Sequence, residues 1–207
     1  MPTPLFIAFE GGEGSGKSSQ IARLAAQLRS EGHQVFATHE PGATSVGRAI
    51  RELVLESDER IAPRSEALLF AADRAHHVET ELQPQLRSGA IVLCDRYVDS
   101  SIAYQGAGRT LSTSEVARLS EWATGGLRPD LTVLLDISPE LGLARAEKRR
   151  GFDRLEREQH DFHDRVRQGF LRLAQAEPDR YLVLDATRSI DELAAEIAAE
   201  VRARLAA

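Results

Sequence analysis

The sequence lacks several features that mark other classes of protein. It has one cysteine, Cys94, which excludes an internal disulfide and a cysteine-based metal cluster. Its apolar runs stay well short of the roughly 20 residues that a membrane-spanning helix needs. Residues 1–4 do not begin a basic and then apolar leader segment. We therefore expect a cytoplasmic protein that does not act in a membrane.

A surplus of basic residues is also missing. The chain has 26 Lys and Arg against 32 Asp and Glu, a net charge of -6. A protein that coats nucleic acid needs a basic surface to neutralise phosphates, so we expect no nucleic-acid polymer as a partner. With 207 residues, 42% of them hydrophobic, the chain is long enough for one full core and short for two. We expect a single domain over residues 1–207.

Short apolar runs alternate with longer segments of helical periodicity. Because helical segments separate all the runs, the pattern predicts an α/β fold, a five-stranded parallel sheet flanked by helices on both faces. Ligands of such sheets bind at the carboxyl ends of the strands. Ile21, Leu24 and Leu28 give the first helix an apolar stripe, and Ser189 with Glu192 forms a capping box before the last one. The predicted strands are 5–10, 34–40, 90–95, 131–137 and 181–186.

A glycine-rich sequence, GGEGSGKS at residues 11–18, lies between the first predicted strand and helix. It matches GxxxxGK[ST], in which glycines let backbone N–H groups surround an anion at a helix N-terminus. Lys17 is expected to reach the transferring phosphates, and Ser18 to hold Mg²⁺. The alternative, a glycine-rich turn without a ligand, does not need that lysine. The expected ATP-binding residues are Gly11, Gly12, Glu13, Gly14, Ser15, Gly16, Lys17, Ser18 and Ser19.

Two other groups of residues suggest binding of a second substrate. Asp95 ends the third predicted strand, where it can bind Mg²⁺ or its waters, and Arg96 can donate to a phosphate. A surface salt bridge is the alternative for Arg96. Phe70 and Arg74 share one helix face and can offer a stacking plane and a donor to a base. Taken alone, the pair is more typical of a core phenylalanine beside a solvated arginine.

The segment DRYVDSSIAYQGAGR, residues 95–109, carries a complete motif, DRYxDSSxAYQGxGR. With blocks at 40–51, 66–75 and 129–143, it resembles the thymidylate kinase family over about residues 5–190. The resemblance implies the P-loop nucleoside-monophosphate kinase fold with a short lid at about residues 145–158. It also implies transfer of the γ-phosphoryl group of ATP to dTMP, and a homodimer. His39 and Ala43 depart from the family pattern of arginine and glycine.

The resemblance also assigns roles to residues. Phe70 stacks on thymine, Arg74 meets its carbonyl edge, and Tyr104 crowds the position of a 2′-hydroxyl. Arg51 and Arg96 hold the dTMP phosphate, and Glu13 matches a carboxylate near the sugar and magnesium. The expected dTMP-binding residues are Glu40, Arg51, Phe70, Arg74, Arg96, Ser101, Tyr104 and Gln105.

The charged segment 145–158 is ambiguous by itself, because such a run is most often a solvated helix face. Phosphoryl transfer, however, benefits from a cation that arrives when both substrates are bound. Family members place a catalytic arginine either in the P-loop, at the position of Gly14, or in the lid. The resemblance therefore implies a lid arginine, first Arg149 and then Arg150 and Arg154. The expected catalytic residues are Lys17, Asp95, Arg96 and Arg149.

Three alternatives remain at this point. A deoxynucleoside kinase shares the P-loop but accepts a 5′-hydroxyl, another nucleoside-monophosphate kinase differs in its base pocket, and a switch module binds a nucleotide without transferring phosphate. The remaining histidines, His33, His77, His160 and His163, show no pattern of metal ligands, and we expect them at the surface.

Overall fold

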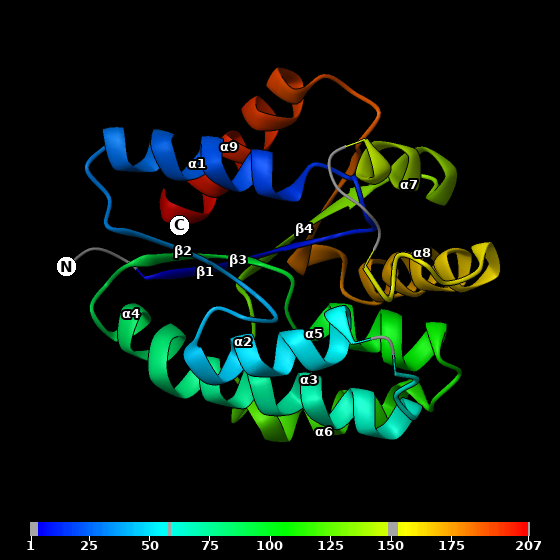
Figure 1. Ribbon diagram of the computed structural model, residues 1–207. Coiled ribbons are helices and arrows are strands. Elements are labelled where there is room, and N and C mark those ends of the chain that lie inside the picture. The colour runs from blue at the N-terminus through cyan, green and yellow to red at the C-terminus, as the bar shows by residue number, and fades with distance from the viewer. Residues whose placement is uncertain (1–3, 58, 149–152, 207) are drawn as a thin grey trace.

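The computed structural model describes residues 4–57, 59–148 and 153–206. Within these residues all five predicted strands are present, each shortened by at most one residue at either end. They form one parallel sheet in the order β2-β3-β1-β4-β5 (Figure 1). The predicted fold class is confirmed. The strands are β1 Leu5–Glu10, β2 Val35–His39, β3 Ile91–Asp95, β4 Leu131–Asp136 and β5 Tyr181–Asp185.

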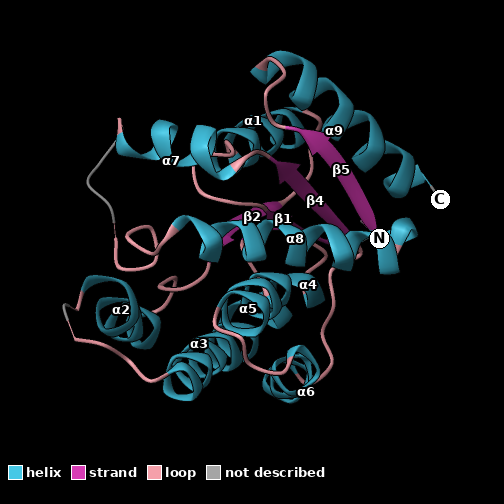
Figure 2. Cartoon of the chain, turned by 90° about the vertical axis from the view of Figure 1, so that its right-hand side faces the viewer, coloured by secondary structure: helices cyan, strands magenta, loops and turns pink. Residues whose placement is uncertain are grey.

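Helices cover both faces of this sheet. Figure 2 shows α1 and α9 on one side of the strands, and α3, α5, α6 and α8 on the other. Three helices continue as π-helical segments, Glu52–Glu56, Val78–Leu82 and Ile102–Gly108, and Pro178–Arg180 is a 3₁₀ turn. The helices are α1 Lys17–Ser30, α2 Ser45–Arg51, α3 Pro63–His77, α4 Gln83–Arg87, α5 Val98–Ser101, α6 Thr113–Thr124, α7 Pro139–Glu147, α8 His160–Ala176 and α9 Ile190–Ala206.

The central strand β1 is buried along its whole length. Because side chains alternate along a strand, Ile7 and Phe9 pack against the α1 and α9 side, whereas Phe6 and Ala8 pack toward the residues that follow α3. A sheet covered on both faces needs such continuous apolar strands. Packing on both faces therefore holds β1 in position, and the P-loop begins where this strand ends.

The last helix begins with the predicted capping box. Ser189 Oγ accepts from the backbone N–H of Glu192 at 3.3 Å, and Glu192 Oε2 accepts from the N–H of Ser189 at 3.0 Å. Ile190, in the first turn, is exposed, whereas Leu193, Ile197 and Val201 farther along the helix are buried. In the described parts of the chain, no helix combines the length and the apolar character needed to cross a bilayer.

Candidate active site

The P-loop connects β1 to α1 and depends on glycines at defined positions. Gly14 has a φ of 63°, in the left-handed region. A Cβ atom there would lie 2.1 Å from the carbonyl oxygen of Gly142 in α7, and a Cβ atom on Gly142 would lie 2.4 Å from the carbonyl oxygen of Glu13. The loop and α7 therefore touch through two glycines, and an arginine at position 14 does not fit this packing.

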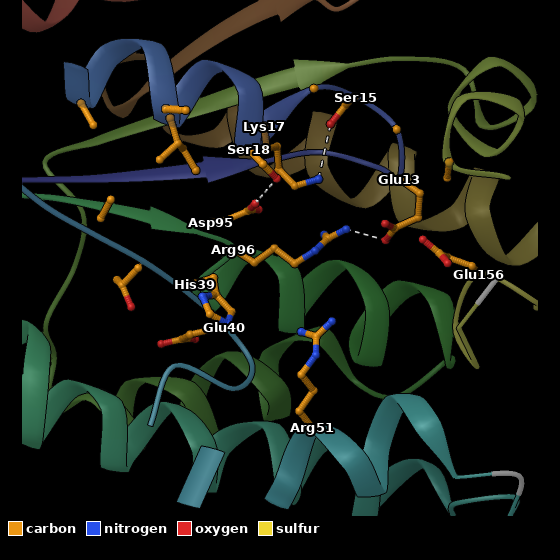
Figure 3. Close-up of a pocket in the computed structure, with 18 of the residues that line it drawn as sticks. Glu13, Ser15, Lys17, Ser18, His39, Glu40, Arg51, Asp95, Arg96 and Glu156 are labelled. Carbon is orange, nitrogen blue, oxygen red and sulfur yellow. Dashed lines mark hydrogen bonds and ion pairs between the residues drawn. The ribbon is translucent and has the colours of Figure 1, made fainter. Parts of the chain in front are cut away.

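Lys17 and Ser18 begin α1 at the carboxyl edge of the sheet (Figure 3). Lys17 Nζ donates to the carbonyl oxygens of Gly11 at 3.1 Å and Gly12 at 3.0 Å. Burial lowers the pKa of the Lys17 ammonium. Ser18 Oγ donates to Asp95 Oδ2 at 3.0 Å. A hydroxyl in the first turn of α1 and a carboxylate at the end of β3 are oxygen ligands of the kind that Mg²⁺ prefers, so these residues fit the ion.

An open cleft of about 900 Å³ lies over the P-loop. Its lining includes the P-loop residues Glu13, Gly14, Ser15, Gly16, Lys17 and Ser18, together with Arg51, Asp95 and Arg96. Of the predicted ATP-binding residues, Gly11, Gly12 and Ser19 do not line it. Gly11 and Gly12 instead bind Lys17 through their carbonyl oxygens, and Ser19 donates its N–H to Gly16 in the first turn of α1.

A second cavity of about 90 Å³ adjoins the cleft and shares four residues with it. The two spaces meet at Glu13, Glu40, Arg51 and Arg96. A large cleft over the P-loop thus opens beside a small pocket whose wall carries two aromatic rings, those of Phe70 and Tyr104, and several donors. Every predicted dTMP-binding residue lines this smaller cavity: Glu40, Arg51, Phe70, Arg74, Arg96, Ser101, Tyr104 and Gln105.

Arg74 is buried in the wall of the small cavity with its guanidinium held on three sides. Its Nε donates to Glu40 Oε2 at 2.7 Å, its Nη1 to Ser101 Oγ at 2.9 Å and its Nη2 to the Tyr97 carbonyl oxygen at 2.9 Å. Since a guanidinium has five N–H groups, two are left without an acceptor among the described residues. Arg74 is therefore fixed in place, and its two remaining N–H groups can donate to a ligand.

His77 corrects the expectation that the remaining histidines are exposed. It is buried, with Nδ1 2.9 Å from Glu40 Oε1 and Nε2 2.8 Å from Thr38 Oγ1. His163 on α8 is buried too, whereas His160 is exposed as predicted. His77 lies three positions after Arg74 and so shares its helix face. That spacing is the sequence signal that indicates a buried position for His77.

Arg96 lies where the two cavities meet. Its φ is 68°, which is rare for a residue with a side chain. Its guanidinium pairs with Glu13, donates to the Gly11 carbonyl oxygen at 3.1 Å and lies 5.0 Å from the centre of the Tyr104 ring. Tyr104 also donates to Glu13, at 2.9 Å. Burial opposes ionisation of Glu13, yet Arg96 and Lys17 hold its pKa at about 2.

Glu10 supports the unusual backbone of Arg96, a role that the sequence did not reveal. This buried carboxylate accepts from the N–H of Tyr97 at 2.8 Å and from the N–H and hydroxyl of Ser100 at 3.1 and 2.6 Å. It thereby ties the end of β1 to the start of α5. Burial and the neighbouring Asp99 raise the pKa of Glu10 to about 7. The only sequence signal was a carboxylate at a strand end.

The lid is described in part. Arg149 and Arg150, two of the three predicted lid arginines, lie outside the described residues. Arg154 donates to the Val54 carbonyl oxygen at 2.7 Å and pairs with the buried carboxylate of Glu66 at 2.5 Å. Its guanidinium is thus bound beside the π-helical segment after α2 and not at the P-loop. A catalytic role for any of these arginines stays a prediction.

Comparison with known proteins agrees with this geometry. A family model described as thymidylate kinase matches residues 9–197. The chain is 56% identical to a thymidylate kinase of Clavibacter michiganensis subsp. michiganensis over 206 residues, which cover 99% of this chain and 98% of that protein. It is also 56% identical to one of Deinococcus radiodurans over 204 residues, 99% of both chains. A crystal structure of thymidylate kinase from Ehrlichia chaffeensis superposes with a TM-score of 0.79 at 31% identity, covering 97% of this chain and 99% of that one. The chain belongs to the thymidylate kinase family.

Proposed function

We propose that this chain transfers the γ-phosphoryl group of ATP to dTMP, giving ADP and dTDP for dTTP synthesis. The observation that carries this proposal is the pair of joined cavities, which share Arg51 and Arg96. One cavity has the P-loop cradle and the other has the ring of Phe70 and the spare donors of Arg74. Two cations at the junction can hold an acceptor phosphate next to the transferring one.

The reaction needs positioning and charge stabilisation more than covalent chemistry. Lys17 contacts the transferring phosphate, while Arg51 and Arg96 orient the acceptor phosphate for in-line attack. Because Arg96 is paired with Glu13, the incoming phosphate competes with that carboxylate for the guanidinium. A lid arginine, first Arg149, adds a cation as the lid closes.

We also propose that Ser18 and Asp95 hold Mg²⁺. Their oxygens lie 3.0 Å apart at the edge of the phosphate cleft. When bound, the ion supplies positive charge to the phosphate oxygens of ATP. The test is metal dependence of turnover in the parent and in Asp95→Asn. Full activity of the parent in chelator would contradict a metal site.

The acceptor is tested with a coupled ADP-release assay on dTMP, dUMP, dCMP, dAMP, dGMP and thymidine. We expect the highest kcat/KM with dTMP. A preference for thymidine would identify a deoxynucleoside kinase, and a preference for another monophosphate would replace dTMP as the substrate. Slow ATP turnover that no acceptor accelerates would support the switch module instead.

The assembly we propose is a homodimer of single-domain chains formed by helix packing. Leu68 on α3 and Leu53 in the adjoining segment are 57% and 54% exposed, and Val46 on the neighbouring α2 is exposed as well. Pairing these helical segments with a second copy would remove their exposed apolar side chains from water. The cytoplasmic location expected from the sequence stays a prediction.

A further inference from the structure

Glu66 is a fully buried carboxylate behind the acceptor pocket, and the function described so far does not use it. Its Oε1 accepts from Gln105 Nε2 at 3.0 Å and from Arg109 Nε at 3.1 Å. Its Oε2 accepts from Arg109 Nη2 at 3.1 Å and from Arg154 Nη2. Glu66 thus joins α3, the π-helical segment Ile102–Gly108 and the segment after residue 152 through donors alone.

The charge state of Glu66 decides the orientation of Gln105. Burial raises the pKa of Glu66, but the hydrogen bonds from Arg109, Gln105 and Arg154 outweigh it and hold that pKa below its ordinary value. At neutral pH Glu66 is ionised, and an ionised carboxylate can only accept hydrogen bonds. Gln105 must therefore turn its NH₂ group toward Glu66. The ionised Glu66 thus determines the orientation of the Gln105 amide, whose O and N atoms are otherwise hard to tell apart.

The other end of the amide is left for a ligand. Gln105 lines the small cavity, and its Oε1 receives no hydrogen bond from the part of the chain that the structure describes. Arg74 lines the same cavity and can only donate. The wall of the pocket thus offers a donor from Arg74 and an acceptor from Gln105.

Building on the proposed function, we propose that Glu66 determines base selection by fixing the amide of Gln105 with its acceptor facing the pocket. Thymine and uracil carry a carbonyl acceptor at O4 beside an N–H donor at N3, which complements Arg74 and Gln105. Cytosine carries an amino donor beside an acceptor at N3. The amino group of cytosine would therefore face the donor of Arg74, and its N3 would face the acceptor of Gln105. Both pairs would leave buried polar groups without a hydrogen bond.

The variant Glu66→Gln tests this role. An amide has only one acceptor oxygen, and Arg109 and Arg154 both donate to the Oε2 position. The NH₂ group of the new amide therefore faces Gln105. Gln105 must then rotate its own amide so that its oxygen accepts from that group. We expect kcat/KM for dTMP and dUMP to fall together while kcat/KM for dCMP does not. The dTMP-to-dCMP ratio then falls about tenfold or more, and the dTMP-to-dUMP ratio is unchanged. A purely structural defect would lower all three substrates alike.

A double-mutant cycle with Gln105→Leu shows whether Glu66 acts through that amide. In the Gln105→Leu background, Glu66→Gln should leave the dTMP-to-dCMP ratio unchanged. The matched control is Glu158→Gln, which neutralises the other carboxylate paired with Arg109 and leaves Gln105 untouched. This control should keep the ratio of the parent.

Two results would overturn the proposal: an unchanged ratio in Glu66→Gln, or an equal fall in the Gln105→Leu background. Where Glu66→Gln does not fold, Glu66→Asp replaces it, since aspartate keeps the negative charge but is too short to hold the amide of Gln105. An unchanged ratio in Glu66→Asp overturns the proposal equally. A parent protein inactive on dTMP would refute the proposed function, whereas an active parent with an unmoved ratio refutes only the role of Glu66.

Discussion

At the scale of single residues, the contact between the P-loop and α7 leaves no room for a methyl group. A Cβ atom on Gly142 would lie 2.4 Å from the carbonyl oxygen of Glu13, and backbone atoms cannot move aside cheaply. We expect Gly142→Ala to cost about 1–3 kcal/mol of stability and to raise the KM for ATP more than that for dTMP. Urea unfolding and steady-state kinetics measure both effects. Leu141→Ala, on the same helix but exposed, is the control and should change neither.

His77 gives a second prediction at this scale. Replacing it by leucine leaves the buried Glu40 Oε1 without its partner, which costs about 1–3 kcal/mol and loosens the support of Arg74. We expect His77→Leu to raise the KM for dTMP severalfold while the KM for ATP stays near that of the parent. His160→Gln, at an exposed site, is the control. Equal changes in both KM values would show that His77 only stabilises the fold.

At the scale of elements, Glu10 joins β1 to α5 and titrates in an unusual range. Its pKa is about 7 in the folded protein against an ordinary value of 4.5. Between these values the folded state binds more protons than the unfolded state, so the contribution of Glu10 to stability falls as the pH rises from about 4.5 to about 7. Glu10→Gln removes this term.

We therefore expect the parent to lose about 1–3 kcal/mol relative to Glu10→Gln when the pH rises from about 5 to about 7.5. Urea unfolding of both proteins at the two pH values measures this change. Glu13→Gln serves as the comparison, because the low pKa of Glu13 lies outside this range. A stability difference between parent and Glu10→Gln that does not change with pH would contradict the assignment.

The sequence predicted the strands and the site better than it predicted the polar contacts behind the site. Apolar runs and the P-loop are local patterns, so β1 to β5 and Lys17 could be placed from neighbouring residues alone. The partners of Glu40 and Arg154 come from 37 and 88 positions away. A charged residue looks the same in a sequence whether it faces water or a distant partner, which is why the sequence predicts only a lid cation at Arg154 and a surface residue at His77.

At the scale of the whole molecule, we expect the exposed side chains of Val46, Leu53 and Leu68 to lie in the face that pairs in a homodimer. A charge in that face would be desolvated on association, so Leu68→Asp should shift the protein to a monomer. Light scattering over a range of concentrations measures the change. Leu141→Asp, at an exposed site on α7, should leave the mass unchanged. A parent that is already monomeric would refute the dimer.

The glycine pair between the P-loop and α7 also has an evolutionary consequence. Gly14→Arg is a single substitution, but with α7 in this position the new side chain would meet the backbone of Gly142. A descendant of this protein could gain a P-loop arginine only after α7 had shifted away. Lineages that begin with this packing are therefore expected to keep Gly14.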